Sequence, residues 1–127
     1  MKKRVVITGL GAITPIGKTA NETWNGIKNK ECGVDEIKLF NAENFKTKFD
    51  AEVKDFNPLD YLDMKQAKRL DKSSQFAIIA GREALKDSGI TTENTDFNNV
   101  GVFVSSGIGG LTTIQQQCEI NYEKGNN

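Results

Sequence analysis

The sequence predicts an α/β fold with a mixed, mostly parallel sheet between helices. Two short apolar segments rich in β-branched residues, residues 5–8 and residues 99–105, are typical of strands covered on both faces. A glycine-rich segment follows each of them, and several helical patterns lie between the two. A strand, a helical crossover and a second strand form a right-handed parallel unit. We therefore expect both glycine-rich segments at the carboxyl ends of strands, the edge where such sheets bind ligands.

The first helix is expected directly after the first glycine-rich segment. Thr19 and Glu22 have the spacing of a capping box, and Trp24 and Ile27 share one helical face. Further along, residues 48–54 alternate strictly between apolar and charged side chains. That alternation predicts a half-exposed strand.

Three more helices are predicted in the second half of the chain. A short one is expected over residues 63–70, and a longer, largely buried one over residues 73–87 with Gly89 as its stop. The last helix is indicated by apolar residues at helical spacing, namely Leu111, Ile114 and Cys118.

Composition excludes several classes of function. The chain has 127 residues, of which 37% are hydrophobic, so it has the length and apolar content of one domain. Its 17 basic and 17 acidic side chains cancel, which gives no sign of nucleic-acid or membrane binding. It contains no histidine. Ser-His and Cys-His nucleophile pairs and histidine-ligated metals are therefore excluded within this chain, and we expect neither a cofactor nor a metal site.

The two cysteines and the amino-terminal residues indicate a cytoplasmic protein. Cys32 and Cys118 lie far apart in the sequence and do not have the spacing of metal ligands. We therefore interpret them as reduced thiols. The early apolar run is interrupted by glycines and by Pro15, unlike a secretory signal, and no run is long enough to span a bilayer.

The first glycine-rich segment, GLGAITPIGKT over residues 9–19, is close to two nucleotide-binding fingerprints. A Walker-type loop has four residues between its first glycine and Gly-Lys-Thr, whereas five separate Gly11 from Gly17, and Pro15 removes one N–H donor. The dinucleotide fingerprint has a glycine where this chain has Thr14. A tight turn after a buried strand is favoured, and a nucleotide-binding α/β domain is the alternative.

Four features in order resemble one family over essentially the whole chain. They are VVITGLGAITPIG, then Trp24, then DKSSQFAIIAGREALKDSGI, then SSGIGGL. Together they resemble the amino-terminal part of the β-ketoacyl-(acyl carrier protein) synthases, and most of all the type II elongation enzymes of bacterial fatty-acid synthesis. The resemblance implies a thiolase-like fold of two similar α/β halves. Residues 1–127 would then be the amino-terminal portion of a β-ketoacyl synthase domain and supply much of the first half, with no second domain.

The resemblance also implies an acyltransferase reaction. An acyl group moves from its carrier to a cysteine thiolate, and malonyl-carrier loses carbon dioxide to give a carbanion that attacks the thioester. The family uses a cysteine, two histidines and a lysine for these steps. This chain has no histidine, and neither Cys32 nor Cys118 is expected to be the nucleophile. No catalytic residue is assigned here, and these residues alone are expected to be inactive.

Two groups of residues are candidates for binding. Lys65, Lys68, Arg69 and Lys72 have the spacing of one helical face, which is ordinarily a solvated face. The resemblance assigns Lys65, Lys68 and Arg69 to docking of the acidic acyl carrier protein. It also places Ile108, with Gly107 beside it, in the acyl-chain pocket, where packing in a turn is the ordinary alternative.

The implied partners are acyl- and malonyl-loaded acyl carrier protein, with a homodimer as the full-length state and neither nucleic acid nor membrane as a partner. Within the same fold, a non-catalytic chain-length or carrier-binding partner and a polyketide ketosynthase are equally compatible with these residues. Acyl-chain length and extender choice are not encoded in any motif described above.

Overall fold

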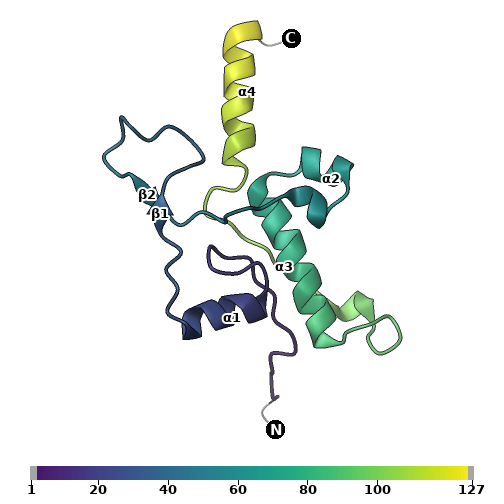
Figure 1. Cartoon of the computed structure of the whole chain (residues 1–127). Coiled ribbons are helices and arrows are strands. Elements are labelled where there is room, and N and C mark those ends of the chain that lie inside the picture. The colour runs from purple at the N-terminus through teal and green to yellow at the C-terminus, as the bar shows by residue number, and fades with distance from the viewer. Residues whose placement is uncertain (1–2, 126–127) are drawn as a thin grey trace. The chain divides into compact units, whose positions relative to one another are not determined.

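The computed structural model, drawn in Figure 1, describes residues 3–125. These residues divide into two compact units. The first unit contains the described residues up to Phe56 together with Ala80–Thr91, and the second contains Asn57–Ile79 and residues 92–125. The helices and strands in chain order are α1 (Ala20–Lys28), β1 (Asp35–Glu36), β2 (Phe49–Asp50), η1 (Pro58–Asp60), α2 (Met64–Arg69), α3 (Lys72–Ser88), η2 (Phe97–Asn99) and α4 (Leu111–Lys124).

Helix α1 begins as the sequence predicts. The Thr19 hydroxyl accepts a hydrogen bond from the backbone N–H of Glu22 at 3.1 Å. The Glu22 carboxylate turns back and accepts the backbone N–H of Lys18 at 2.8 Å, one residue before the position that the capping box predicts. Trp24 and Ile27 remain 58% and 54% exposed, so the predicted apolar face is not covered within the described residues.

The predicted helices of the second half are confirmed. Asp63 caps α2 by accepting the N–H of Gln66 at 2.8 Å, and Leu70 adopts an extended conformation that ends this helix. Helix α3 starts two residues later and runs for 17 residues. Gly89 follows it with φ +67°, the left-handed conformation in which glycine is favoured.

The predicted parallel sheet is absent from residues 3–125. Residues 5–8 and residues 99–105 form no strand, and Val5 and Phe103 are 90% and 96% exposed. The described strands are β1 and β2, an antiparallel pair in which Asp35 lies opposite Asp50. Both apolar segments have the composition of strands, but a strand forms only when a neighbour takes up its backbone N–H and C=O groups.

The buried core of the described chain is small. Leu62 and Ile79 are its buried hydrophobic side chains, and Gln75 is buried with them. All three belong to the second unit. Helix α3 is thus less buried than predicted, and α4 is exposed along its whole length.

In the first unit, the glycine-rich segment after residues 5–8 packs directly on the second half of α3. A Cβ atom added to Gly11 would lie 2.8 Å from the backbone nitrogen of Ala84, closer than real side chains approach. The carboxylate of Glu83 accepts two backbone N–H groups, those of Ala12 and Ala20, each at 2.9 Å. This one side chain therefore joins the glycine-rich segment to the first residue of α1.

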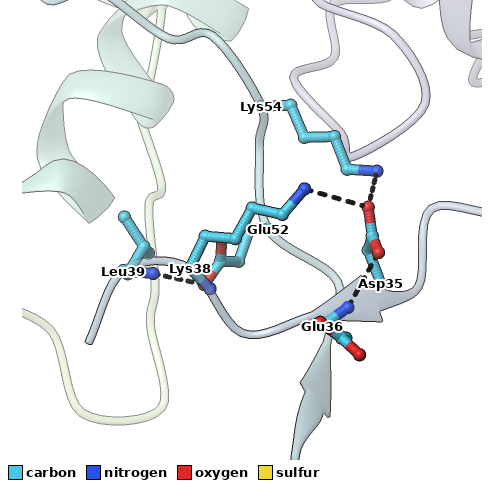
Figure 2. A network of polar contacts seen from close by, with 6 residues as sticks. All are labelled: Asp35, Glu36, Lys38, Leu39, Glu52 and Lys54. Carbon is cyan, nitrogen blue, oxygen red and sulfur yellow. Dashed lines mark hydrogen bonds and ion pairs between the residues drawn. The ribbon is translucent and has the colours of Figure 1, made fainter. Parts of the chain in front are cut away.

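Asp35 in β1 is the centre of an ionic network (Figure 2). Its carboxylate accepts hydrogen bonds from Lys54 at 2.8 Å and from Lys38 at 3.5 Å, and from the backbone N–H of Glu36. The bond from Lys54 is the main reason that the pKa of Asp35 falls from 3.8 to about 2. Alongside, Glu52 accepts the backbone N–H groups of Lys38 and Leu39, which ties the chain after β1 to the chain after β2.

Replacing Glu83 with glutamine tests the connection that this side chain makes between the glycine-rich segment and α1. An amide has one oxygen, so it satisfies one backbone N–H and turns an NH2 group toward the other. We expect Glu83→Gln to lower the free energy of unfolding of the intact protein by about 1–2 kcal/mol, measured by urea denaturation. Glu93→Gln is the control, because Glu93 is exposed and makes no side-chain hydrogen bond within residues 3–125. Equal effects of the two substitutions would contradict the prediction.

Replacing Lys54 with methionine tests the ionic network around Asp35. We expect the pKa of Asp35 to rise from about 2 toward 3.8, measured by NMR titration of its carboxyl carbon. Because the folded state has the lower pKa, the stabilisation from Asp35 is complete above about pH 4 and is lost as the pH falls toward 2. Lys48→Met should leave this pKa unchanged, since the Lys48 ammonium donates to the carbonyls of Ala42 and Glu43. A depressed pKa that survived Lys54→Met would show that the backbone N–H of Glu36 and the ammonium of Lys38 are its main causes.

Candidate functional site

The basic face of α2, formed by Lys65, Lys68 and Arg69, is the first candidate site. All three side chains are exposed, and none forms an ion pair within the described residues. Lys68 and Arg69 lie in the last turn of the helix, where the backbone dipole favours positive charge. The face therefore presents three cations that are not neutralised by the unit that carries them.

Lys72 does not belong to this face, so the predicted stripe of four charges is wrong. Helix α2 ends at Arg69, and Lys72 is the first residue of α3. The spacing of the four residues assumed one continuous helix. Leu70, with φ −98° and ψ 132°, interrupts it.

A buried amide holds α2 in place. The side-chain nitrogen of Gln75 donates to the backbone oxygen of Ala67 at 3.0 Å and to that of Leu70 at 2.9 Å. These carbonyls lie at the end of α2, where a helix has no partners of its own for them. Gln75 is 6% exposed. This buried side chain therefore holds the end of the helix that carries the basic face. Sequence reasoning did not single out Gln75, because only the fold reveals which carbonyls it meets.

The second candidate site is the glycine loop, residues 106–110, which contains Gly107 and Ile108. The backbone N–H of Gly109 donates to the hydroxyl of Ser106 at 3.0 Å, and Gly109 has φ +78°, so the loop is a tight turn that requires glycine. Ile108 is 70% exposed. The loop therefore presents one apolar side chain that is not enclosed within the described residues.

Both cysteines are surface thiols of their units. Cys32 is free and exposed, and so is Cys118 on α4. Its helical neighbours Leu111 and Ile114 are 58% and 51% exposed, because α4 has no covering element in the described chain. Within residues 3–125, no three His, Cys, Asp or Glu side chains are grouped as metal ligands would be. No helix in that range is long and apolar enough to cross a membrane.

The first glycine-rich segment is a turn in which several backbone donors are already used. Thr14 and Gly17 exchange backbone hydrogen bonds across a tight turn, at 2.8 Å and 3.3 Å. The N–H groups of Leu10 and Ala12 are taken by carboxylates of α3. A phosphate would have to displace these carboxylates and would be repelled by their charge. The geometry thus favours the turn over the nucleotide-binding alternative.

Residues 2–127 match the family described as "Beta-ketoacyl synthase, N-terminal domain". The chain belongs to this family. Curated relatives agree: "3-oxoacyl-[acyl-carrier-protein] synthase 2" of Synechocystis sp. is 41% identical over 98% of the chain and 30% of the relative. The protein of the same description from Vibrio harveyi is 40% identical over the same shares. This β-ketoacyl synthase domain thus spans about 30% of the length of these curated relatives.

Solved structures give the same fold. The ishigamide ketosynthase/chain length factor superposes with a TM-score of 0.76 at 26% identity, over 99% of this chain and 31% of the other. A type II PKS acyl-carrier protein in complex with its ketosynthase bound to the hexaketide gives 0.75 at 26% identity, over 98% and 32%. The chain therefore has the thiolase-like fold of the ketosynthases.

Proposed function

We propose that the protein carrying this chain is a 3-oxoacyl-(acyl carrier protein) synthase that elongates acyl-carrier with malonyl-carrier in fatty-acid synthesis. The observation that carries the proposal is the 41% identity to a synthase of that description over 98% of the chain. In the reaction, a cysteine thiolate takes the acyl group and releases the carrier thiol. Malonyl-carrier then loses carbon dioxide, and its carbanion attacks the acyl-enzyme to form 3-oxoacyl-carrier and free the thiolate.

The contribution of this chain to that reaction is binding. It has no histidine to take part in acyl transfer or decarboxylation, and both of its cysteines are free, exposed thiols. What it offers is an unneutralised basic face on α2 and an apolar side chain at the tip of the glycine loop.

The basic face of α2 suits an acidic carrier protein. Lys65, Lys68 and Arg69 project from one short helix whose end is fixed by Gln75. Charges at the rim of an interface act mainly by speeding association and orienting the partner. The matched complex of a ketosynthase with an acyl-carrier protein supports this partner.

The glycine loop suits the acyl chain. Ile108 stands between glycines in a turn, so no neighbouring side chain of the loop screens it. An exposed isoleucine at such a tip gains by covering apolar surface of a ligand or of a neighbouring part of the protein. We assign Ile108 and Gly107 to the wall of an acyl pocket.

The whole protein is proposed to be a cytoplasmic homodimer in which residues 1–127 form the first part of one synthase domain. Its sheet is mostly parallel and includes residues 5–8 and 99–105, because these apolar segments have strand composition and stand exposed here. Sedimentation of the intact protein tests the dimer.

A chain-length factor is the second candidate, because one matched structure is a ketosynthase/chain length factor. Incubating the intact protein with acyl-carrier and weighing it by mass spectrometry separates the two. One acyl group per chain supports the synthase, whereas no acylation supports the non-catalytic partner.

Reversing the charge of Lys65, Lys68 and Arg69 to glutamate tests the docking face. We expect the Kd for acidic carrier protein to rise at least about tenfold and its salt dependence to flatten, measured by titration at several ionic strengths. Turnover of a small carrier-free thioester should be retained. The same reversal at Lys28, Lys30 and Lys46, three exposed lysines of the first unit, is a control of equal net charge. If carrier-dependent and carrier-free rates fall together, the face is structural.

Replacing Ile108 with phenylalanine tests the pocket. We expect the longest accepted acyl primer to become shorter, because each excluded methylene loses about 0.8 kcal/mol of transfer free energy. Rates with short primers should be nearly unchanged, as measured by kcat/KM across a series of primers. Ile120→Phe on α4 is the control. A uniform loss with all primers and a lower melting temperature would assign Ile108 to ordinary packing.

A further inference from the structure

Asp71, the second of the two residues between α2 and α3, connects the two candidate binding sites. Its backbone oxygen accepts the N–H of Gln75 at 2.9 Å, as part of the start of α3. Its side chain reaches across to α4, where the carboxylate accepts the hydroxyl of Thr113. The same carboxylate lies against Gly110, at which an added Cβ would stand 2.9 Å from the Asp71 Cγ. All of these residues belong to the second unit.

This contact lies at the start of helix α4. Gly110 occupies the cap position, and α4 has no side-chain cap hydrogen bond there. The first N–H groups of a helix lack partners within it and favour a negative charge nearby. Asp71 brings that charge from another element, and it can do so because Gly110 has no side chain in the way.

The contact also fixes one end of the glycine loop. Ile108 precedes Gly110 by two residues, and within the loop the bond from the Gly109 N–H to Ser106 keeps the turn closed. On the other side of the loop, residues 99–105 form no strand in the described chain. On the side of α4, the loop that carries Ile108 is therefore held through Gly110 and its contact with Asp71.

The other side of Asp71 leads to the basic face. Leu70, its neighbour in the chain, donates its N–H to Gln66 and accepts the Gln75 amide through its oxygen. A displacement of α2 is thus transmitted to Asp71 through one residue that is hydrogen-bonded on both sides.

We infer that Asp71 is a positioning residue through which the carrier-docking helix α2 sets the place of Ile108, so that carrier docking influences acyl-chain selection. The inference rests on the proposed function, which assigns α2 to the carrier and Ile108 to the acyl chain. It adds a physical connection between the docking helix and the acyl-chain residue. The connection runs from α2 through Leu70, Asp71 and Gly110 to the glycine loop.

Thr113→Val in the intact protein tests this connection while leaving Asp71 in place. Valine keeps the shape of threonine and removes the hydroxyl donor. Thr112→Val is the matched control, because Thr112 is the preceding residue of α4 and its hydroxyl makes no hydrogen bond within residues 3–125. Asp71→Asn, which keeps an acceptor oxygen but removes the charge, should give an intermediate effect.

The first measurement is the ratio of kcat/KM for a long and a short acyl-carrier primer. We expect this ratio to change about tenfold in Thr113→Val, the size of one hydrogen bond to a charged group, and to stay constant in Thr112→Val. A merely structural cap would lower the melting temperature and leave the ratio unchanged, which would overturn the inference.

The second measurement needs no catalysis. Hydrogen exchange of residues 106–114 is compared with and without unloaded carrier protein. We expect the carrier to slow exchange in the wild type and in Thr112→Val but not in Thr113→Val. Equal protection in all three would overturn the connection while leaving docking intact. No binding of the carrier to the wild type would instead refute the proposed function and the inference together.

Discussion

The second half of α3 is the surface on which the first unit is assembled, and backbone packing makes this possible. Gly11 brings its chain so close to α3 that no side chain fits between them. At that distance the carboxylates of Glu83 and Asp87 reach backbone N–H groups of the opposing segment directly. The glycines and the acidic residues are therefore parts of one arrangement. A segment that looks like a phosphate loop in the sequence is instead filled by the protein's own anions.

The helices and their ends were predictable because their signals are local. Thr19, Asp63 and Gly89 act at the ends of helices through bonds or conformations that involve only near neighbours. The sheet was not predictable in the same way, because a strand forms only with a neighbouring strand, and the sequence of one segment does not specify that neighbour. Of the sites, the three cations of α2 were found from their spacing, whereas Lys72 was grouped with them although the predicted helices themselves end at residue 70 and begin again at residue 73.

The cations of the chain differ in what they do for the fold. Lys54 and Lys38 hold Asp35, while Lys18 and Lys48 donate to backbone carbonyls. The basic face of α2 takes no part in such contacts within the described residues. Such side chains remain available to a partner, and only the structure showed which lysines were already in use.

The exposure of residues 5–7 and 102–104 makes aggregation a risk for this polypeptide. Both segments are uncharged, rich in β-branched or aromatic residues and free of proline, and their large side chains are 58–96% exposed. Such segments pair readily with one another between molecules and seed aggregates. While they stay uncovered, these segments expose extended apolar chain of the kind that makes incompletely folded proteins aggregate.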